Sequence, residues 1–279
     1  MVSQDGIAVK KAGRVGYTEN DMGAWSPQQY QKFSDLRNRA CRDLAVHVEV
    51  PEARRVVDLG CGPGNLGGIA PDYWPRASIK GIDSSPAMIE TARQSFPRHE
   101  WVLGDISEWA ESEERCDIVF SNAALQWAPN HGELFPKLLN HVNPGGALAV
   151  QMPGYRAPQY EILREMAAAP RWRRWFPEGR AREWRCYELD SYHDLLKPRA
   201  SRLDLWATEY WQVMADVNGI VEFYKSTGLR PYLDPMEDAA ERQHFLDEYA
   251  GRLGGVFPRA ATGEIFFPMR RIFIVARLD

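Results

Sequence analysis

Long apolar runs, basic blocks and paired cysteines are all missing from this chain. No apolar stretch approaches the roughly 20 residues of a membrane-spanning helix, which argues against a membrane protein. The net charge is −4 and no basic block is present, which argues against a nucleic-acid partner. Four cysteines form no CxxC pair or metal-ligand spacing, and no signal peptide is recognisable. We therefore expect a cytoplasmic protein with reduced thiols and no metal, membrane or nucleic-acid partner.

What is present fits an ordinary globular protein. The 279 residues are 44% hydrophobic and 26% charged, enough for one large α/β domain with a cap or for two small domains. Residues 1–22 are polar and are expected to form a flexible tail. The sequence leaves the oligomeric state open, and a monomer is compatible with it.

The stretch "VVDLGCGPGN" carries the first functional signal. Residues 56–59 read Val-Val-Asp-Leu; apart from Asp58 they are apolar, and the two valines are β-branched, which predicts a buried strand. Gly60, Gly62 and Gly64 then predict a tight turn whose backbone a ligand can approach. A strand, a glycine turn and a helix together begin a Rossmann-type unit.

The ligand of this turn is not well described by a nucleotide pyrophosphate. Counted from Gly60, the first glycine after the strand, the spacing is G-x-G-x-G, and Asn65 stands where the dinucleotide fingerprint has its final glycine; no Lys-Ser/Thr pair follows to make a P-loop. Asp58 would repel a pyrophosphate but suits a cationic group. A ligand that combines an amino acid with adenosine fits these residues better than NAD.

Polar residues also end the following predicted strands. "SIKGI" leads into Asp83, at the position where a carboxylate accepts ribose hydroxyls, although the run from Asp83 to Pro86 also resembles a helix cap. "WVLGDI" places Asp105 and Ile106 where they can contact adenine, and "CDIVFSN" ends at Asn122. "NPGGALAVQMP" supplies a turn and a fifth strand. These patterns predict a parallel sheet with a ligand at the carboxyl ends of its strands.

The remaining chain has weaker patterns. A helix from Ser26 to about His47 carries an apolar face, residues 153–200 lack clear periodicity, and 217–253 contains two amphipathic pieces. The predicted order is a flexible tail (1–22), an N-terminal lid helix (23–54), a Rossmann-like core (55–152), a cap region (153–263) that includes a core strand near 202–214, and C-terminal core strand(s) (264–279), one of them antiparallel.

Taken together, these motifs resemble the class I S-adenosylmethionine-dependent methyltransferases. "NAALQWAPNH" and "STGLRPYL", with "YQKFSDLRNRA" and "RRIFIVAR", are similar to the trans-aconitate methyltransferase family over about residues 24–279. The resemblance implies a Rossmann-like α/β fold with a seven-stranded, mostly parallel sheet, one antiparallel strand and a helical cap. It implies S-adenosylmethionine as cofactor, S-adenosylhomocysteine as product, and a small carboxylic acid such as trans-aconitate as acceptor.

The resemblance and the strand ends together give the candidate site residues. The expected cofactor-binding residues are Tyr30, Phe33, Arg37, Asp58, Gly60, Gly62, Gly64, Asp83, Ser84, Met88, Asp105, Ile106 and Asn122. The expected acceptor-binding residues are Trp25, Gln126, Trp127, Tyr155, Arg230 and Arg271. No catalytic residue is assigned; Gln126, Trp127 and His131 are candidates for positioning the acceptor.

An ionised carboxylate needs no general base, which suits a sequence without an obvious catalytic constellation. Each candidate also has a simpler interpretation: His131 precedes a helix and fits a cap region, and Trp127 fits a core position. The "RWRRWFPEGR" stretch suits a solvated or substrate-gating loop better than a nucleic-acid patch in a net acidic chain. Departures from the family pattern near the expected acceptor pocket leave two alternatives open. These are a different small-molecule acceptor or non-methyl chemistry, and a non-catalytic cofactor-binding module.

Overall fold

The computed structural model describes residues 34–154, 157–177, 186–225 and 227–279. The predicted tail and the start of the predicted lid helix lie outside this part of the chain. Within it, helix α2 (Ser34–Ala45) is the part of the lid helix that can be compared with the prediction.

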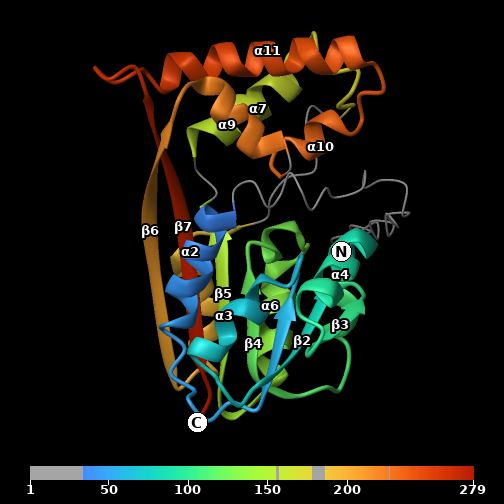
Figure 1. Cartoon of the computed structure of the whole chain (residues 1–279), viewed down its shortest axis with the longest axis vertical. Helices are drawn as coiled ribbons and strands as arrows, with labels where there is room; N and C mark the ends of the chain where they lie inside the picture. Colours follow the sequence, from blue (N-terminus) through green and yellow to red (C-terminus); the bar gives the residue numbers. More distant parts are fainter. Residues whose placement is uncertain (1–33, 155–156, 178–185, 226) are drawn as a thin grey trace, which may run out of the picture.

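A seven-stranded sheet forms the core, in the order β3-β2-β1-β4-β5-β7-β6 (Figure 1). Among these strands β7 runs antiparallel to both neighbours, and the other pairs from β3 to β5 are parallel. The predicted α/β fold, mostly parallel with one antiparallel strand, is therefore confirmed. The strands are β1 (Arg55–Leu59), β2 (Ser78–Asp83), β3 (Glu100–Leu103), β4 (Cys116–Asn122), β5 (Val142–Pro153), β6 (Arg202–Met214) and β7 (Ile265–Arg277).

Helices cover both faces of the sheet, and its central strands are therefore buried on both sides. Residues alternate between two apolar clusters along β4, with Ile118 and Phe120 in one and Val119 in the other. The first cluster includes residues of α2, α3 (Asn65–Ile69) and α4 (Pro86–Ser95), and we call this the α2 face. The second includes residues of α5 (Ile106–Trp109), α6 (His131–Asn140) and α8 (Leu189–Leu196). Short 3₁₀ turns, η2 (Ala70–Asp72) and η3 (Leu125–Trp127), follow α3 and β4.

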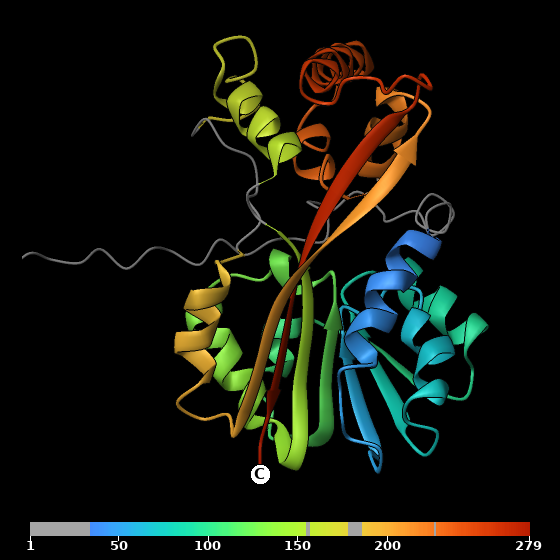
Figure 2. The ribbon, with the colours of Figure 1, turned by 90° about the vertical axis from the view of Figure 1, so that its left-hand side faces the viewer.

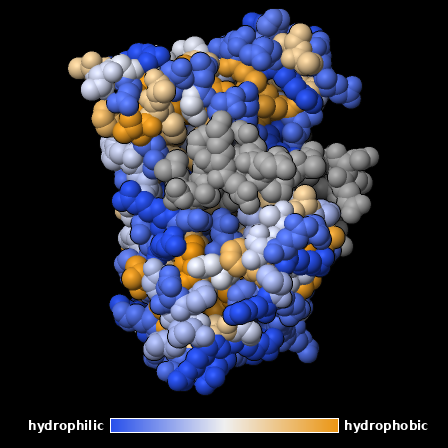
Figure 3. Space-filling view, viewed as in Figure 1, coloured by the Kyte–Doolittle hydropathy of each residue, from blue (hydrophilic) through white to orange (hydrophobic). Residues whose placement is uncertain are grey.

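The longest strands, β6 and β7, leave the sheet and reach the cap (Figure 2). β5 pairs with β7 only as far as Pro153, opposite Arg271, whereas β6 and β7 continue as a two-stranded ribbon to Met214 and Ile265. The cap consists of α7 (Pro158–Ala168), α9 (Val217–Lys225), α10 (Arg230–Leu233) and α11 (Ala239–Val256). On the face shown in Figure 3, hydrophobic side chains gather in the cap above a mostly hydrophilic core surface.

The structure differs from the sequence-based expectation mainly between residues 153 and 200. This region lacks clear periodicity, so no individual helix is predicted in it, and the structure shows α7 and α8 there. α8 packs on α6, β6 and β7, so it belongs to the core although it lies inside the range predicted for the cap. Residues 217–253 form three helices rather than two, because a separate turn of helix, α10, follows α9. No helix in the described part of the chain is long and apolar enough to cross a membrane.

Candidate functional site

The glycine turn joins the carboxyl ends of β1 and β2. The amides of Gly60 and Cys61 both donate to the carbonyl of Ile82, at 2.7 and 3.1 Å. Gly60, Gly62 and Gly64 have φ angles of 72°, 54° and 84°, a region that side chains disfavour. A Cβ at Gly60 would lie 2.1 Å from the Cβ of Ala124, whereas a Cβ at Gly62 would meet no described residue within 4 Å. Gly60 is thus needed for packing against the end of β4, and the backbone at Gly62 stays open to a ligand.

Asp83 holds this turn and the start of α4 together. Its Oδ2 accepts from the amide of Gly62 and its Oδ1 from the amide of Ser85, both at 2.9 Å. Burial raises the pKa of Asp83, and these two hydrogen bonds oppose the rise. The helix cap is Ser85 rather than Asp83, since Ser85 precedes Pro86 and its side chain accepts from Met88. Each Asp83 oxygen still has a lone pair available for ribose hydroxyls.

Asp58 lies on the α2 face, 4% exposed, one residue before the end of β1. No group in the described part of the chain donates a hydrogen bond to its carboxylate. Burial raises the pKa of Asp58 to about 8, and the negative charge of Asp83 adds to the rise. Asp58 in turn contributes to the raised pKa of Cys41 on α2, after burial of that thiol. A buried, unpartnered carboxylate of this kind is well suited to a cationic ligand group.

Three buried polar atoms without partners lie on the same face. Asn122 and Gln151 stand opposite each other in the β4–β5 register, two residues beyond Phe120 and Ala149, which belong to the α2-face cluster. The Oδ1 of Asn122 and the Nε2 of Gln151 are buried and have no hydrogen-bond partner within the described part of the chain. The Oδ1 of Asn38, one turn before Cys41 on α2, is in the same condition. Because buried polar atoms are normally paired, this set indicates that a polar ligand completes the site.

The other expected cofactor residues are placed less uniformly. Asp105 is exposed and caps α5, its Oδ1 accepting from Ser107 at 2.7 Å. Ile106 reaches the glycine turn: its Cδ1 would lie 3.7 Å from a Cβ placed at Gly60. Ser84 is exposed and Met88 is 3% exposed on α4. Tyr30 and Phe33 lie outside the described residues, as does the side chain of Arg37.

Gln126 and Trp127 belong to the η3 turn, and His131 begins the helix α6 that follows it. Gln126 is buried and donates to the carbonyl of Ala123 at 2.7 Å, while its Oε1 has no partner. Trp127 is half-buried and engaged in further contacts. His131 is fully buried: its Nδ1 lies 2.6 Å from the hydroxyl of Tyr192 and its Nε2 2.8 Å from the carbonyl of Leu125. His131 is therefore not available as a general base or an acceptor contact, and any positioning role acts through Leu125.

The two arginines expected to bind the acceptor have different environments. Arg230, at the start of α10, lies 3.5 Å from Asp234 one turn later and makes further contacts. Arg271, on β7, is partly buried, and its guanidinium has no hydrogen-bond or ion-pair partner among the residues that the structure describes. It lies opposite Pro153, where β5 ends, and two residues from Phe273 on the α2 face. Trp25 and Tyr155 lie outside the described residues.

Several polar residues of this region are not predicted from the sequence. They are Asn38, Gln151, Gln159, Tyr160, Tyr210 and Tyr224. A signal existed for Gln151, since an amide inside the apolar run "ALAVQMP" is expected to be buried and to need a partner. The cap tyrosines gave no such signal, because aromatic residues at helical spacing normally form core.

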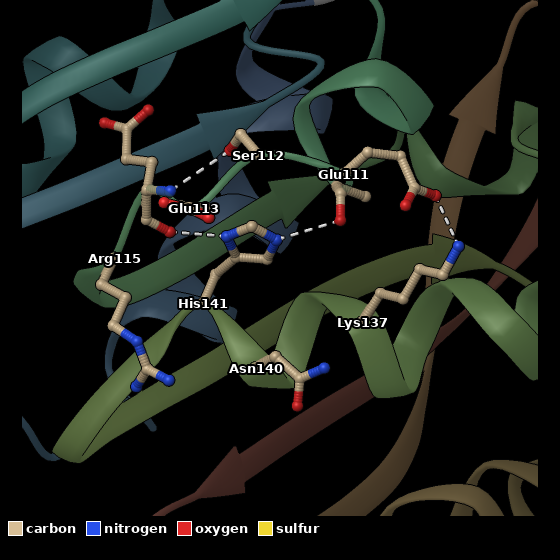
Figure 4. Close-up of a pocket in the computed structure, with 9 residues that line it drawn as sticks. Glu111, Ser112, Glu113, Arg115, Lys137, Asn140 and His141 are labelled. Carbon is tan, nitrogen blue, oxygen red and sulfur yellow. Dashed lines mark hydrogen bonds and ion pairs between the residues drawn. The ribbon is translucent and has the colours of Figure 1, made fainter.

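A hollow of about 460 Å³, shown in Figure 4, lies at the other end of the parallel strands from the glycine turn. It is lined by the acidic segment 111–114, by Lys137 and by His141, whose ring nitrogens face the carbonyls of Glu114 and Ala110. Residues 111–114 precede β4, so this hollow is beside the amino end of that strand. Its position and its three glutamates make it unsuitable for the cofactor or for an anionic acceptor.

Comparison with known proteins agrees with this geometry. Residues 56–146 match a family model described as "Methyltransferase domain". A trans-aconitate 2-methyltransferase of Azoarcus sp. (strain BH72) is 42% identical over 262 residues, covering 91% of this chain and 99% of that protein. One from Rhodopseudomonas palustris (strain BisB18) is 39% identical over 256 residues, with 91% and 99% covered.

Solved structures share the fold at low sequence identity. The YcgJ protein from Bacillus subtilis has a TM-score of 0.56 and 12% identity, covering 87% of this chain and 99% of that one. Phosphoethanolamine N-methyltransferase 2 of Haemonchus contortus, solved with S-adenosyl-L-methionine, has a TM-score of 0.52 and 14% identity, covering 87% and 53%. The match to these relatives, at 39–42% identity over nearly the full length of both chains, decides the family. This chain belongs to the trans-aconitate 2-methyltransferase family and is an S-adenosylmethionine-dependent methyltransferase.

Proposed function

We propose that this enzyme methylates a carboxylate of trans-aconitate or of a closely related small carboxylic acid. The observation that carries the proposal is the partly buried guanidinium of Arg271, which no described residue pairs. A buried cation without a counter-ion is costly, so an anionic ligand is the natural partner. The names of the most similar curated relatives support the same acceptor.

The described residues fit S-adenosylmethionine. Asp83 would accept the ribose hydroxyls with its remaining lone pairs. Asp58 and the Oδ1 of Asn122 are acceptors that suit the ammonium group, and the Nε2 of Gln151 is a donor that suits the carboxylate. We also propose that α2 is part of a lid over this site, because Asn38 on that helix adds a third unpartnered atom.

The chemistry requires little of the protein. When bound, S-adenosylmethionine supplies a methyl group made electrophilic by its sulfonium. A carboxylate oxygen forms the new O–CH₃ bond with its own lone pair while the C–S bond breaks, so no proton is transferred. With a pKa near 4, the acceptor is already ionised at pH 7. Rate enhancement then comes from holding the oxygen in line with the methyl group, in a site that excludes water.

This chemistry agrees with the engaged ring of His131, which follows the η3 turn. His131 is the histidine nearest to Gln126 and Trp127 in the chain, and both of its ring nitrogens are engaged. We propose that Gln126 and Trp127 line the acceptor site and that Arg271 neutralises a carboxylate that does not react. Arg230 has its own partner in Asp234, so its role is secondary.

We further propose a cytoplasmic enzyme with a small-molecule acceptor and no nucleic-acid partner. All four cysteines are buried and free, as expected in a reducing compartment. The net charge of −4 is unfavourable for binding a polyanion.

The test is transfer of label from methyl-labelled S-adenosylmethionine to a panel of di- and tricarboxylates, aromatic acids and phenols. The proposal predicts that trans-aconitate has the highest kcat/KM of the panel, or is exceeded only by another small polycarboxylate. Preference for a phenol or an uncharged acceptor would refute it. Tight cofactor binding without turnover of any acceptor would instead support a binding module.

A further inference from the structure

Two buried tyrosines of the cap form a hydrogen-bonded pair. Tyr160 on α7 and Tyr224 on α9 have ring centroids 5.5 Å apart at an interplanar angle of 89°. They are 8% and 3% exposed. The hydroxyls of Tyr160 and Tyr224 are hydrogen-bonded to each other, and the Nε2 of Gln159 donates to the Tyr224 oxygen at 3.1 Å. With Tyr160 as the donor of this pair, the Tyr224 oxygen accepts two hydrogen bonds and its own proton is left for a further acceptor.

The "STGLRPYL" motif fixes this pair in place. A Cβ at Gly228 would lie 2.9 Å from the Cδ1 of Tyr224 and 3.1 Å from the Cε1 of Tyr160, so only glycine allows the chain to pass so closely. The amides of Thr227 and Leu229 both donate to the carbonyl of Tyr224, at 2.9 and 3.0 Å. The motif that carries the narrower family resemblance thus shapes the tyrosine pair, in addition to contributing Arg230.

Arg271 lies on the strand beneath this pair. Tyr224 packs edge-on against Phe267 at 6.0 Å, and Phe267 and Arg271 lie on the same face of β7, four residues apart. On the neighbouring strand, Thr208 stands opposite Arg271 and Tyr210 opposite Met269. The charge of Arg271 lowers the pKa of Tyr160 and of Tyr224, against the larger effect of burial, which raises both. The guanidinium and the two hydroxyls therefore share one electrostatic environment.

We propose that Tyr224, supported by Tyr160 and Gln159, acts with Arg271 as a receptor for the non-reacting carboxylate of the acceptor. This inference depends on the proposed function. A guanidinium neutralises the carboxylate, and a hydroxyl that already accepts two hydrogen bonds is a strengthened, fixed donor to it. Such a receptor selects acceptors that carry a second carboxylate at the right distance from the one that is methylated.

The test is a double-mutant cycle between Tyr224→Phe and Arg271→Met, measured as kcat/KM for trans-aconitate. Tyr224→Phe keeps the ring against Tyr160 and Phe267 and removes only the hydroxyl. We expect a loss of about 10- to 30-fold from this change and a loss of about 30-fold or more from Arg271→Met. If both groups hold one carboxylate, the double variant should retain at least about threefold more activity than the product of the single losses predicts.

Tyr249→Phe is the matched control, because Tyr249 is another buried cap tyrosine whose hydroxyl donates to the backbone carbonyl of Gln159 at 3.3 Å. Its effect should be small and should multiply with that of Arg271→Met. Calorimetric affinity for S-adenosylhomocysteine should be unchanged in Tyr224→Phe, which also shows that the variant is folded. The receptor alone would be overturned if the parent enzyme methylates trans-aconitate and Tyr224→Phe has no effect on kcat/KM. It would also be overturned if the losses from Tyr224→Phe and Arg271→Met simply multiply in the double variant. A parent inactive on every carboxylate would overturn the proposed function and the receptor with it.

Discussion

Gly60 packs directly on Ala124, so that a Cβ at Gly60 would lie 2.1 Å from the Cβ of Ala124. Ala124 follows Ala123, which has a φ of 57°, at the end of β4. The turn after β1 and the turn after β4 are thus fitted to each other. The expected cofactor-binding glycines lie on the first turn, and Gln126 and Trp127, expected to bind the acceptor, follow the second, so the contact would join the two parts of the expected site.

Gly60→Ala should therefore weaken S-adenosylmethionine binding by at least about tenfold, since the Ala123–Ala124 turn must move to admit the methyl group. Gly145→Ala is the control: its φ is 79°, but a Cβ there would meet nothing within 4 Å. Both variants should lose about 1–2 kcal/mol of unfolding free energy from the left-handed backbone, and only Gly60→Ala should lose affinity in titration calorimetry. Equal affinities would show that the turn contact is unimportant for the cofactor.

Asp58 should link cofactor binding to proton release. With a folded pKa of about 8 and an unfolded value near 4, the folded protein keeps a proton that the unfolded chain has released. Stability without cofactor should consequently fall as the pH rises from about 4 to about 8, and Asp58→Asn should remove that part of the slope.

A cationic cofactor group beside Asp58 favours the charged carboxylate and lowers its pKa. Binding near pH 7 should therefore release protons, measured by calorimetry in buffers of different ionisation enthalpy. Asp58→Asn should abolish the release. Proton uptake on binding, or the same release in Asp58→Asn, would assign the ammonium group to another residue.

Asp83 should affect both stability and affinity. Asp83→Ala leaves the amides of Gly62 and Ser85 without their acceptor and removes the expected ribose contact, so each property should fall by about 1–3 kcal/mol. Ser85→Ala removes only the α4 cap and serves as the comparison, with a smaller loss of stability and little loss of affinity. If titration shows the same affinity for Asp83→Ala and the parent, Asp83 does not contact the cofactor.

His131 should be important for stability and not for proton transfer. With cofactor saturating, the chemical step should be nearly flat between about pH 6 and 9, because a carboxylate acceptor needs no base there. His131→Asn should lower the unfolding free energy by about 1–3 kcal/mol, as the hydroxyl of Tyr192 and the carbonyl of Leu125 lose their partner. Tyr192→Phe should behave similarly. A limb near pH 7 that disappears in His131→Asn would mean that the acceptor requires deprotonation.

The parts of the fold with strong local patterns were predictable from the sequence. The run "RVVDL" before three glycines indicates a buried strand followed by a tight turn, and it forms β1. The thirteen-residue strands β6 and β7 coincide with the apolar and aromatic stretches expected to form them. Helices α7 and α8 were missed, because the segment around them is rich in Arg, Trp and Pro and their apolar faces become clear only against the cap and α6.

The candidate site was predictable where it depends on strand ends and not where it depends on contacts between distant segments. Asp58, Asp83 and Asn122 end adjacent strands, so the topology of the sheet brings them together. Arg230 and Arg271 looked equivalent in the sequence, although the i,i+4 spacing of Arg230 and Asp234 already indicated a local partner. The pairing of Tyr160 with Tyr224 depends on the packing of two cap helices and has no local signature.

The central claim is methyl transfer to a carboxylate without proton transfer, and the product formed from trans-aconitate and methyl-labelled S-adenosylmethionine tests it most directly. We expect one label per product molecule, released as methanol by mild alkaline hydrolysis, because the new bond is that of a methyl ester. Label that survives this treatment, or label that appears only on a phenol, an amine or a carbon acceptor, would contradict the claim.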